Sequence, residues 1–183
     1  SDPKSIEIFN SILASGSCEI GAQLHAWVTP PHDEEINTRN SYACNLPEPL
    51  KQKKIESLFG RLEQSFGAKP LIYRAGRYGA GSHTISVLRE MGVRIDSSVR
   101  SLFDYSPQEG PDFKNCSLHP YWLTKGEVFE LPLTSVFAGM LRANGQKLFG
   151  RAFESETARA FLARTKLLER IALTPEGIPL NRA

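Results

Sequence analysis

The chain has 183 residues, of which 22 are basic, 20 are acidic and 40% are hydrophobic, so its formal charge is only +2. This length is typical of one domain, and the composition excludes wholesale disorder. The balanced charge argues against a nucleic-acid partner. No apolar run reaches the ~20 residues that cross a bilayer. The first residues lack the apolar core of a signal peptide, which favours a cytoplasmic location.

Hydrophobic periodicity predicts helices that alternate with strands, and therefore an α/β fold with a parallel sheet. The first helix is expected after Asp2, a good N-cap, and should end at Gly16. A strand is expected over 18–28, where Gln23 and His25 alternate with small or apolar residues. The further expected elements are a helix over 49–66, a strand over 71–73, a helix over 82–91, strands over 93–96 and 128–133, a helix over 154–171 and a helix start at Thr174.

Polar side chains gather at the ends of three of these predicted strands. Gln23, His25 and Trp27 close the first, Arg74 follows the second, and Asp96 ends the third. The carboxyl ends of parallel strands meet at one rim, so an imidazole, a guanidinium and a carboxylate there would suit hydrolysis or anion handling. Two structural alternatives stay open: an Arg74–Asp96 salt bridge and a hydrogen-bonded, non-functional His25.

A glycine-rich turn precedes the helix predicted over 82–91. Gly76 and Gly81 have the spacing of the glycines in a phosphate-binding loop, but Ser82 and His83 replace the lysine and hydroxyl residue of that motif. Backbone N–H groups at the helix start could still hold an anion, while close packing of strand and helix explains the glycines equally well. Anion or nucleotide binding at 76–84 is therefore a weaker alternative.

Several segments together resemble one enzyme family. Residues 18–27, followed by Thr29-Pro30-Pro31, resemble the second motif of the polysaccharide deacetylases, the NodB-homology group of carbohydrate esterases. The similarity is greatest to a divergent bacterial branch whose motif reads approximately EIGxHxHxW-x-TPP. Residues 73–79, 96–99, 120–122 and 130–132 continue the match, so the resemblance extends over nearly the whole chain.

This resemblance implies a fold, a reaction and a set of residues. The fold would be a distorted (β/α)7-type barrel, with 1–183 as a single deacetylase-like domain. The reaction would be metal-dependent hydrolysis of a non-peptide C–N bond in an N-acetylated sugar or polysaccharide, with a divalent ion, zinc first, polarising the acetyl carbonyl. The resemblance implies His25 and Gln23 as metal ligands, Arg74 and Asp96 as catalytic residues, and Trp27, Arg77, Tyr78, Tyr121 and Trp122 as substrate-binding residues.

The sequence also departs from the family pattern. Gln23 stands where the branch has a histidine, and a neutral amide is a poorer zinc ligand. The motif that carries the catalytic base and the late histidine motif have no counterpart in 1–183. We therefore expect an incomplete barrel, truncated at both ends, with little activity alone and with unpaired sheet edges that favour a homo-oligomer. The alternative is a non-catalytic sugar-binding or interaction protein on a degenerate deacetylase barrel.

Overall fold

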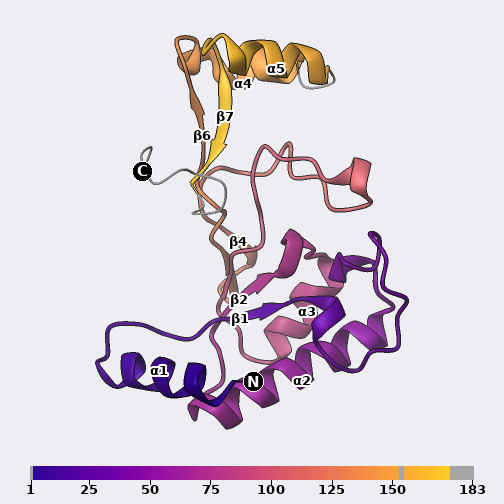
Figure 1. Cartoon of the computed structure of the whole chain (residues 1–183), viewed down its shortest axis with the longest axis vertical. Coiled ribbons are helices and arrows are strands. Elements are labelled where there is room, and N and C mark those ends of the chain that lie inside the picture. Colours follow the sequence, from indigo (N-terminus) through magenta and orange to yellow (C-terminus); the bar gives the residue numbers. More distant parts are fainter. Residues whose placement is uncertain (1, 153–154, 174–183) are drawn as a thin grey trace. The chain divides into compact units, whose positions relative to one another are not determined.

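The computed structural model describes residues 2–152 and 155–173. The chain divides into two compact units, Ser1–Pro132 and Leu133–Ala183 (Figure 1). The helix start expected at Thr174 lies outside the described residues. Within the described part, no helix is both long and apolar enough to span a membrane.

A five-stranded sheet in the order β1-β2-β3-β5-β4 forms the centre of the first unit. Its strands are β1 (Ala22–Leu24), β2 (Ile72–Ala75), β3 (Ile95–Asp96), β4 (Tyr121–Thr124) and β5 (Val128–Glu130). All neighbours pair in parallel except β4 and β5, which are antiparallel. The mixed α/β fold with a mostly parallel sheet is thus confirmed. In the described residues this sheet is open, with β1 and β4 outermost, so the expected barrel closure is not found there.

The strand register sorts the side chains onto two faces. One row crosses all five strands and consists of Ala22, Tyr73, Asp96, Glu130 and Tyr121. Because side chains alternate along a strand, the rows before and after it point to the opposite side. We call that side the open face; its residues are Gln23, Arg74, Ile72, Ile95, Phe129 and Trp122.

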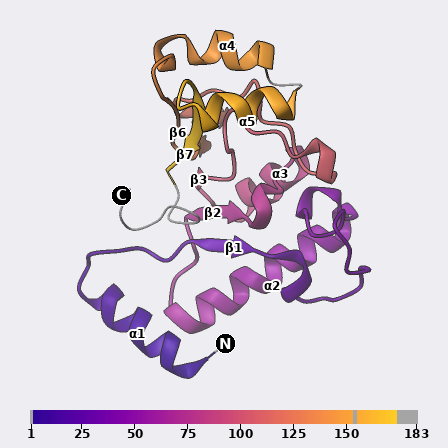
Figure 2. The same ribbon diagram turned by 45° about the horizontal axis from the view of Figure 1, so that its top comes forward.

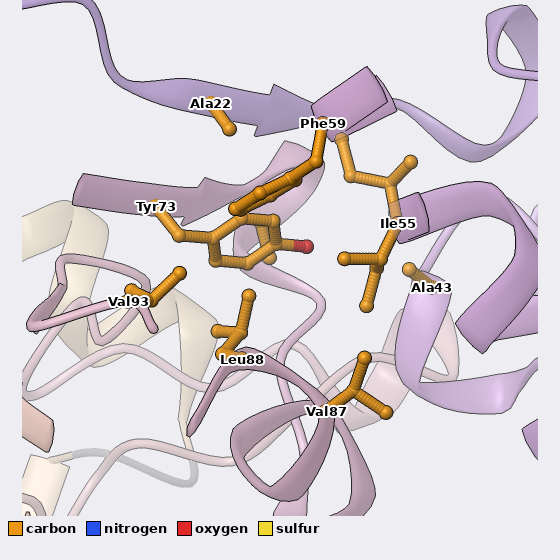
Figure 3. Close-up of a cluster of buried hydrophobic side chains, with 10 residues drawn as sticks. Ala22, Ala43, Ile55, Phe59, Tyr73, Val87, Leu88 and Val93 are labelled. Atoms are coloured by element: carbon orange, nitrogen blue, oxygen red, sulfur yellow. The ribbon is translucent and has the colours of Figure 1, made fainter. Parts of the chain in front are cut away.

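Helices α2 (Glu48–Phe66) and α3 (Ser82–Glu90) pack on the other side, which we call the covered face (Figures 1 and 2). Figure 3 shows the Tyr73 ring in the middle of this core, with Phe59 packed over it and its hydroxyl pointing toward Ile55. Burying such a side chain contributes about 1.5–3 kcal/mol. The cluster therefore fixes β1 and β2 to the helices.

Helix α1 (Pro3–Ala14) begins as predicted at Asp2, whose carboxylate accepts the N–H of Ser5 at 3.0 Å. The structure describes every residue of α1, and none of them is buried. It meets α2 through the edge-on rings of Phe9 and Phe66, whose centroids lie 6.3 Å apart. The helix is confirmed, and its apolar face stays largely accessible.

The strand predicted over 18–28 is much shorter than expected. The N–H groups of Val28 and Thr29 both bond back to the His25 carbonyl at 3.2 Å, which turns the backbone into the short 3-10 helix η1 (Ala26–Val28). Strand β1 therefore ends at Leu24, and Val28, which the predicted strand included, is exposed outside it.

The second unit holds the antiparallel pair β6 (Ser135–Ala138) and β7 (Glu169–Ala172), with helices α4 (Gly145–Ala152) and α5 (Glu156–Arg164). The single helix predicted over 154–171 is wrong at its end. Helix α5 stops at Arg164, and Lys166 adopts a left-handed conformation with φ 55° before β7 starts. The apolar residues 167–172 fit a helix period, but the turn redirects them into a strand.

Candidate functional site

The carboxyl end of β1 carries both candidate metal ligands. Gln23 is exposed on the open face, directly beside Arg74 of β2 in the register. His25 follows with extended backbone, and its half-buried ring meets the Trp27 ring edge-on at 4.9 Å between centroids. The Nδ1 atom of His25 is buried and has no hydrogen-bond partner among the described residues. One bonding position of this imidazole is therefore unused within the described chain.

Gly76 makes room for His25. A Cβ atom at Gly76 would lie 2.6 Å from His25 Nδ1 and 2.4 Å from the Leu24 carbonyl oxygen, so only glycine fits. His83 lies in the first turn of α3, and its Nε2 atom is 3.7 Å from the carboxylate of Glu48, the first residue of α2. A carboxylate therefore stands beside the expected anion site. Both observations favour the packing explanation of the glycine-rich turn over anion binding.

The two residues after Gly76 are left-handed although neither is glycine, with φ 51° at Arg77 and 60° at Tyr78. Such conformations cost free energy and persist where surrounding contacts enforce them. Arg77 supplies these contacts by donating to Ser41, to the Tyr42 hydroxyl at 3.0 Å and to Gln108 Oε1 at 3.0 Å. Its guanidinium therefore ties the long loop before α2 to the end of β2.

Tyr78 belongs to an aromatic cluster beside this turn. Its ring stacks on Tyr105 at 5.6 Å between centroids, and the Arg100 guanidinium lies 5.3 Å from the Tyr78 centroid and 3.9 Å from that of Phe103. Arg100 also donates to the Tyr105 hydroxyl at 2.7 Å. Tyr78 thus contributes to a packed group of rings and a cation, which stabilise one another.

Lys54 of α2 is fully buried beneath the loop that follows His25. Its ammonium donates to the carbonyls of Ala26 at 2.9 Å, Thr29 at 2.6 Å and Pro31 at 2.6 Å, and lies 2.9 Å from the Glu34 carboxylate. A buried charge is tolerated only when it is paired and hydrogen-bonded, as here. Lys54 therefore fixes the path of the chain immediately after His25 and Trp27.

Arg74 is held by the residue after Asp96. Its Nε and Nη2 atoms donate to the carbonyl and hydroxyl oxygens of Ser97, each at 3.1 Å. The Ser97 hydroxyl in turn donates to the Leu131 carbonyl at 2.8 Å. Asp96 points to the covered face, so the two predicted catalytic residues lie on neighbouring strands but on opposite sides of the sheet.

On the covered face Asp96 has Glu130 as its register neighbour, and they are only 1% and 0% exposed. The Ser98 hydroxyl donates to Asp96 and accepts the N–H of Ala75 at 2.8 Å. The N–H of Val99 donates to Glu130 Oε1 at 2.9 Å. The segment after β3 therefore wraps around two buried carboxyl groups.

The two carboxyl groups perturb one another. Burial raises the pKa of Asp96 to about 6, although hydrogen bonds from Ser98 and Glu130 oppose the rise. Burial and then the Asp96 charge raise the pKa of Glu130 to about 8, against the pull of Arg74. Burial and the same carboxyls also raise the pKa of Tyr121 to about 12. At neutral pH the pair therefore holds one proton and one negative charge.

The two aromatic residues expected from β4 lie on different sides. Tyr121 belongs to the covered row beside Glu130, whereas Trp122 is on the open face and 53% exposed. Trp122 packs edge-on against Phe129 at 5.0 Å between centroids and borders a shallow hollow of about 420 Å³. Arg94 also lines the hollow, which therefore lies at the amino ends of β3 and β5, away from His25.

The structure thus divides the expected site residues. Gln23, His25 and Arg74 gather at the carboxyl ends of β1 and β2, whereas Asp96 and Tyr121 are on the covered face. Sequence reasoning missed Glu130 and Lys54 as residues that shape the site. Alternation with the buried Val128 could have placed Glu130 inside. Lys54 lies four residues before the partly buried Leu58, so the helical spacing places both on the same face of α2. Because lysine is charged, this spacing was not taken as a sign of burial.

A metal needs more ligands than this edge provides. A catalytic zinc site uses three protein ligands, whereas His25 and Gln23 supply one imidazole and one neutral amide. Within residues 2–152 and 155–173, no group of three or more histidine, cysteine, aspartate or glutamate side chains is arranged to hold a metal ion. The donor set present at this edge therefore does not fit a complete zinc site.

Comparison with known proteins gives a weak likeness to a solved structure. No family model matches the chain, and no curated protein matches it. A crystal structure of a candidate polysaccharide deacetylase from Mycobacterium smegmatis is similar, with 24% sequence identity and a TM-score of 0.46. The likeness covers 70% of this chain and 35% of that one, so this chain spans about a third of that protein's length. A likeness of this size assigns no role to any residue.

Proposed function

We propose that the chain is a polysaccharide-deacetylase-like domain that binds an N-acetylated sugar at the open face, beside Gln23, His25 and Arg74. One observation supports this above the others. Residues from two separate motifs, far apart in the sequence, occupy adjacent register positions on β1 and β2. In parallel sheets, ligands bind outside the carboxyl ends of the strands, which is where these residues lie.

The side chains at this edge suit an acetamido group. Its carbonyl oxygen accepts hydrogen bonds, which the Arg74 guanidinium and the Gln23 amide can donate, and its N–H can donate to the Gln23 oxygen. The indole of Trp27 offers an apolar surface of the kind on which sugar rings pack. The burial of Lys54 and the contacts of Arg77 hold the surrounding loops in place.

The reaction in this proposal is hydrolysis of the acetamide C–N bond with a divalent metal, zinc first. His25 supplies an imidazole of the kind that binds such an ion. Because His25 and Gln23 fall short of a complete ligand set, we expect this chain alone to release little or no acetate. Acetate release from N-acetylglucosamine oligosaccharides, lost in His25→Ala, would contradict that expectation.

A non-catalytic sugar-binding protein is the second candidate, and the exposed, neutral Gln23 in a ligand position favours it. Equilibrium dialysis against zinc separates the two. Binding of about one zinc per chain, lost in His25→Ala and kept in the exposed-residue control His119→Ala, would support the enzyme site. Binding of oligosaccharide by metal-free protein, with no zinc binding that depends on His25, would support the second candidate.

A further inference from the structure

Glu130 lies where the covered face meets the residues that hold Arg74. Asp96 directly precedes Ser97, whose carbonyl and hydroxyl oxygens accept the two Arg74 hydrogen bonds. Glu130 directly precedes Leu131, whose carbonyl accepts the Ser97 hydroxyl at 2.8 Å. The buried carboxyl pair and the guanidinium are therefore on opposite faces of the same two stretches of backbone. A shift of either stretch moves the acceptors of Arg74.

Burial disfavours the state in which both carboxyl groups of the pair are ionised. Asp96 and Glu130 are register neighbours with almost no exposure, and two like charges there would repel each other without water to screen them. Glu130 Oε2 is buried and meets no hydrogen-bond donor among the described residues. With a proton on Oε2, Glu130 becomes a hydrogen-bond donor and can donate to the Asp96 carboxylate.

We infer that Glu130 is a positioning residue for Arg74: its protonated carboxyl keeps β3 and β5 together so that Ser97 holds the guanidinium, and loss of the proton weakens that hold. The inference goes beyond the proposed function in naming a residue on the far side of the sheet. It rests on the proposed function only in placing Arg74 at the sugar. The consequence is a site that is ordered at neutral pH and loosens in alkali.

Four other titratable or charged groups face the pair. These are Tyr73 on β2, Tyr121 on β4, Cys116 in the preceding loop and Arg74 itself. Burial raises the pKa of both tyrosines, and burial followed by the Glu130 charge raises the pKa of the Cys116 thiol. Arg74 keeps its charge and attracts an ionised Glu130. Since the pKa of Glu130 is raised to about 8, the change belongs near that pH.

Nuclear magnetic resonance tests this on the purified chain without any sugar. The Glu130 side-chain carboxyl carbon and the Arg74 Nε–H signal, assigned by its loss in Arg74→Lys, are followed from about pH 5.5 to about pH 9.5. We expect both signals to change with one midpoint near pH 8. In Glu130→Gln the Arg74 signal should keep its low-pH position throughout. The control Glu127→Gln, an exposed acid in the turn before β5, should behave like wild type.

Two results would overturn the inference: a Glu130 midpoint near the ordinary value for glutamate, or an Arg74 signal that ignores the Glu130 titration. The wild-type titration decides both, even if Glu130→Gln does not fold. Failure of this test leaves sugar binding at the open face untouched. Failure to bind sugar, conversely, leaves the coupling between Glu130 and Arg74 as measured.

Discussion

The ammonium of Lys54 serves three carbonyl oxygens and one carboxylate, and no solvent reaches it. Lys54→Met keeps the apolar stem but removes the donor, so the Glu34 carboxylate and the loop carbonyls lose their partner. We expect the free energy of unfolding, measured in urea, to fall by about 3 kcal/mol. The neighbouring exposed residue gives the control, Lys53→Met, which should change it by less than about 0.5 kcal/mol. Equal stability of the two variants would show that the buried ammonium does not hold the loop.

Gly76→Ala tests the close approach of β2 to His25. The added methyl would overlap the Leu24 carbonyl and the imidazole, and a backbone oxygen cannot move aside, so we expect a loss of about 1–3 kcal/mol in unfolding free energy. The same substitution at Gly60, in the interior of α2 with open space around it, should stabilise by about 0.5–1 kcal/mol. If both variants were stabilised, His25 would not lie against Gly76.

Part of the site could be predicted from single residues. Gln23 and His25 share a face because the alternation along β1 holds as far as His25, and Arg74 ends the next strand. The sequence pattern could not show whether Asp96 lies on the same face of the sheet as Arg74. Which face a residue takes depends on the register between two strands, and a shift of one residue reverses it. The burial of Lys54 was equally hidden, because no sequence pattern places its partners, three loop carbonyls and the Glu34 carboxylate, beside it.

At the scale of elements, the pairing of β3 with β5 should make stability depend on pH. Both carboxyl groups have pKa values above those of the unfolded chain, so the folded state binds more protons between about pH 4.5 and about pH 8. The free energy of unfolding should therefore fall as the pH rises through this window. In Glu130→Gln most of this fall should vanish. Urea denaturation at several pH values measures it, and an identical slope in both proteins would contradict the assignment.

The elements themselves were predicted best where one pattern dominates. Helices α2 and α3 follow from apolar spacing and terminal glycines, and β2 and β3 from short apolar runs. Strand β1 was overestimated because alternation continues past Leu24, whereas backbone bonds to the His25 carbonyl start a turn. Strand β4 was not predicted, although Tyr121 to Leu123 form a short apolar run. Trp122 is exposed, and the strand is held by its antiparallel pairing with β5.

For the whole molecule, the outer edges of the sheet predict self-association. Strands β1 and β4 have unpaired outer edges within the described part of the chain, and such edges pair readily with another chain. We expect light scattering to give a mass close to that of a dimer at high protein concentration, falling on dilution. A monomer mass at every concentration would count against pairing through these edges.

The central claim is that an N-acetylated sugar binds at the open face. The most direct measurement is a titration of N-acetylglucosamine oligosaccharide into the isotope-labelled chain, followed through the Gln23 side-chain amide, the Trp27 indole and the Arg74 Nε–H signals. We predict saturable shifts of all three and a loss of affinity of about tenfold or more in Arg74→Gln, because a charged hydrogen-bond donor is removed. The exposed-residue control Arg94→Gln, at the other end of the strands, should bind like wild type. No saturable shift, or shifts confined to the covered face, would contradict the account.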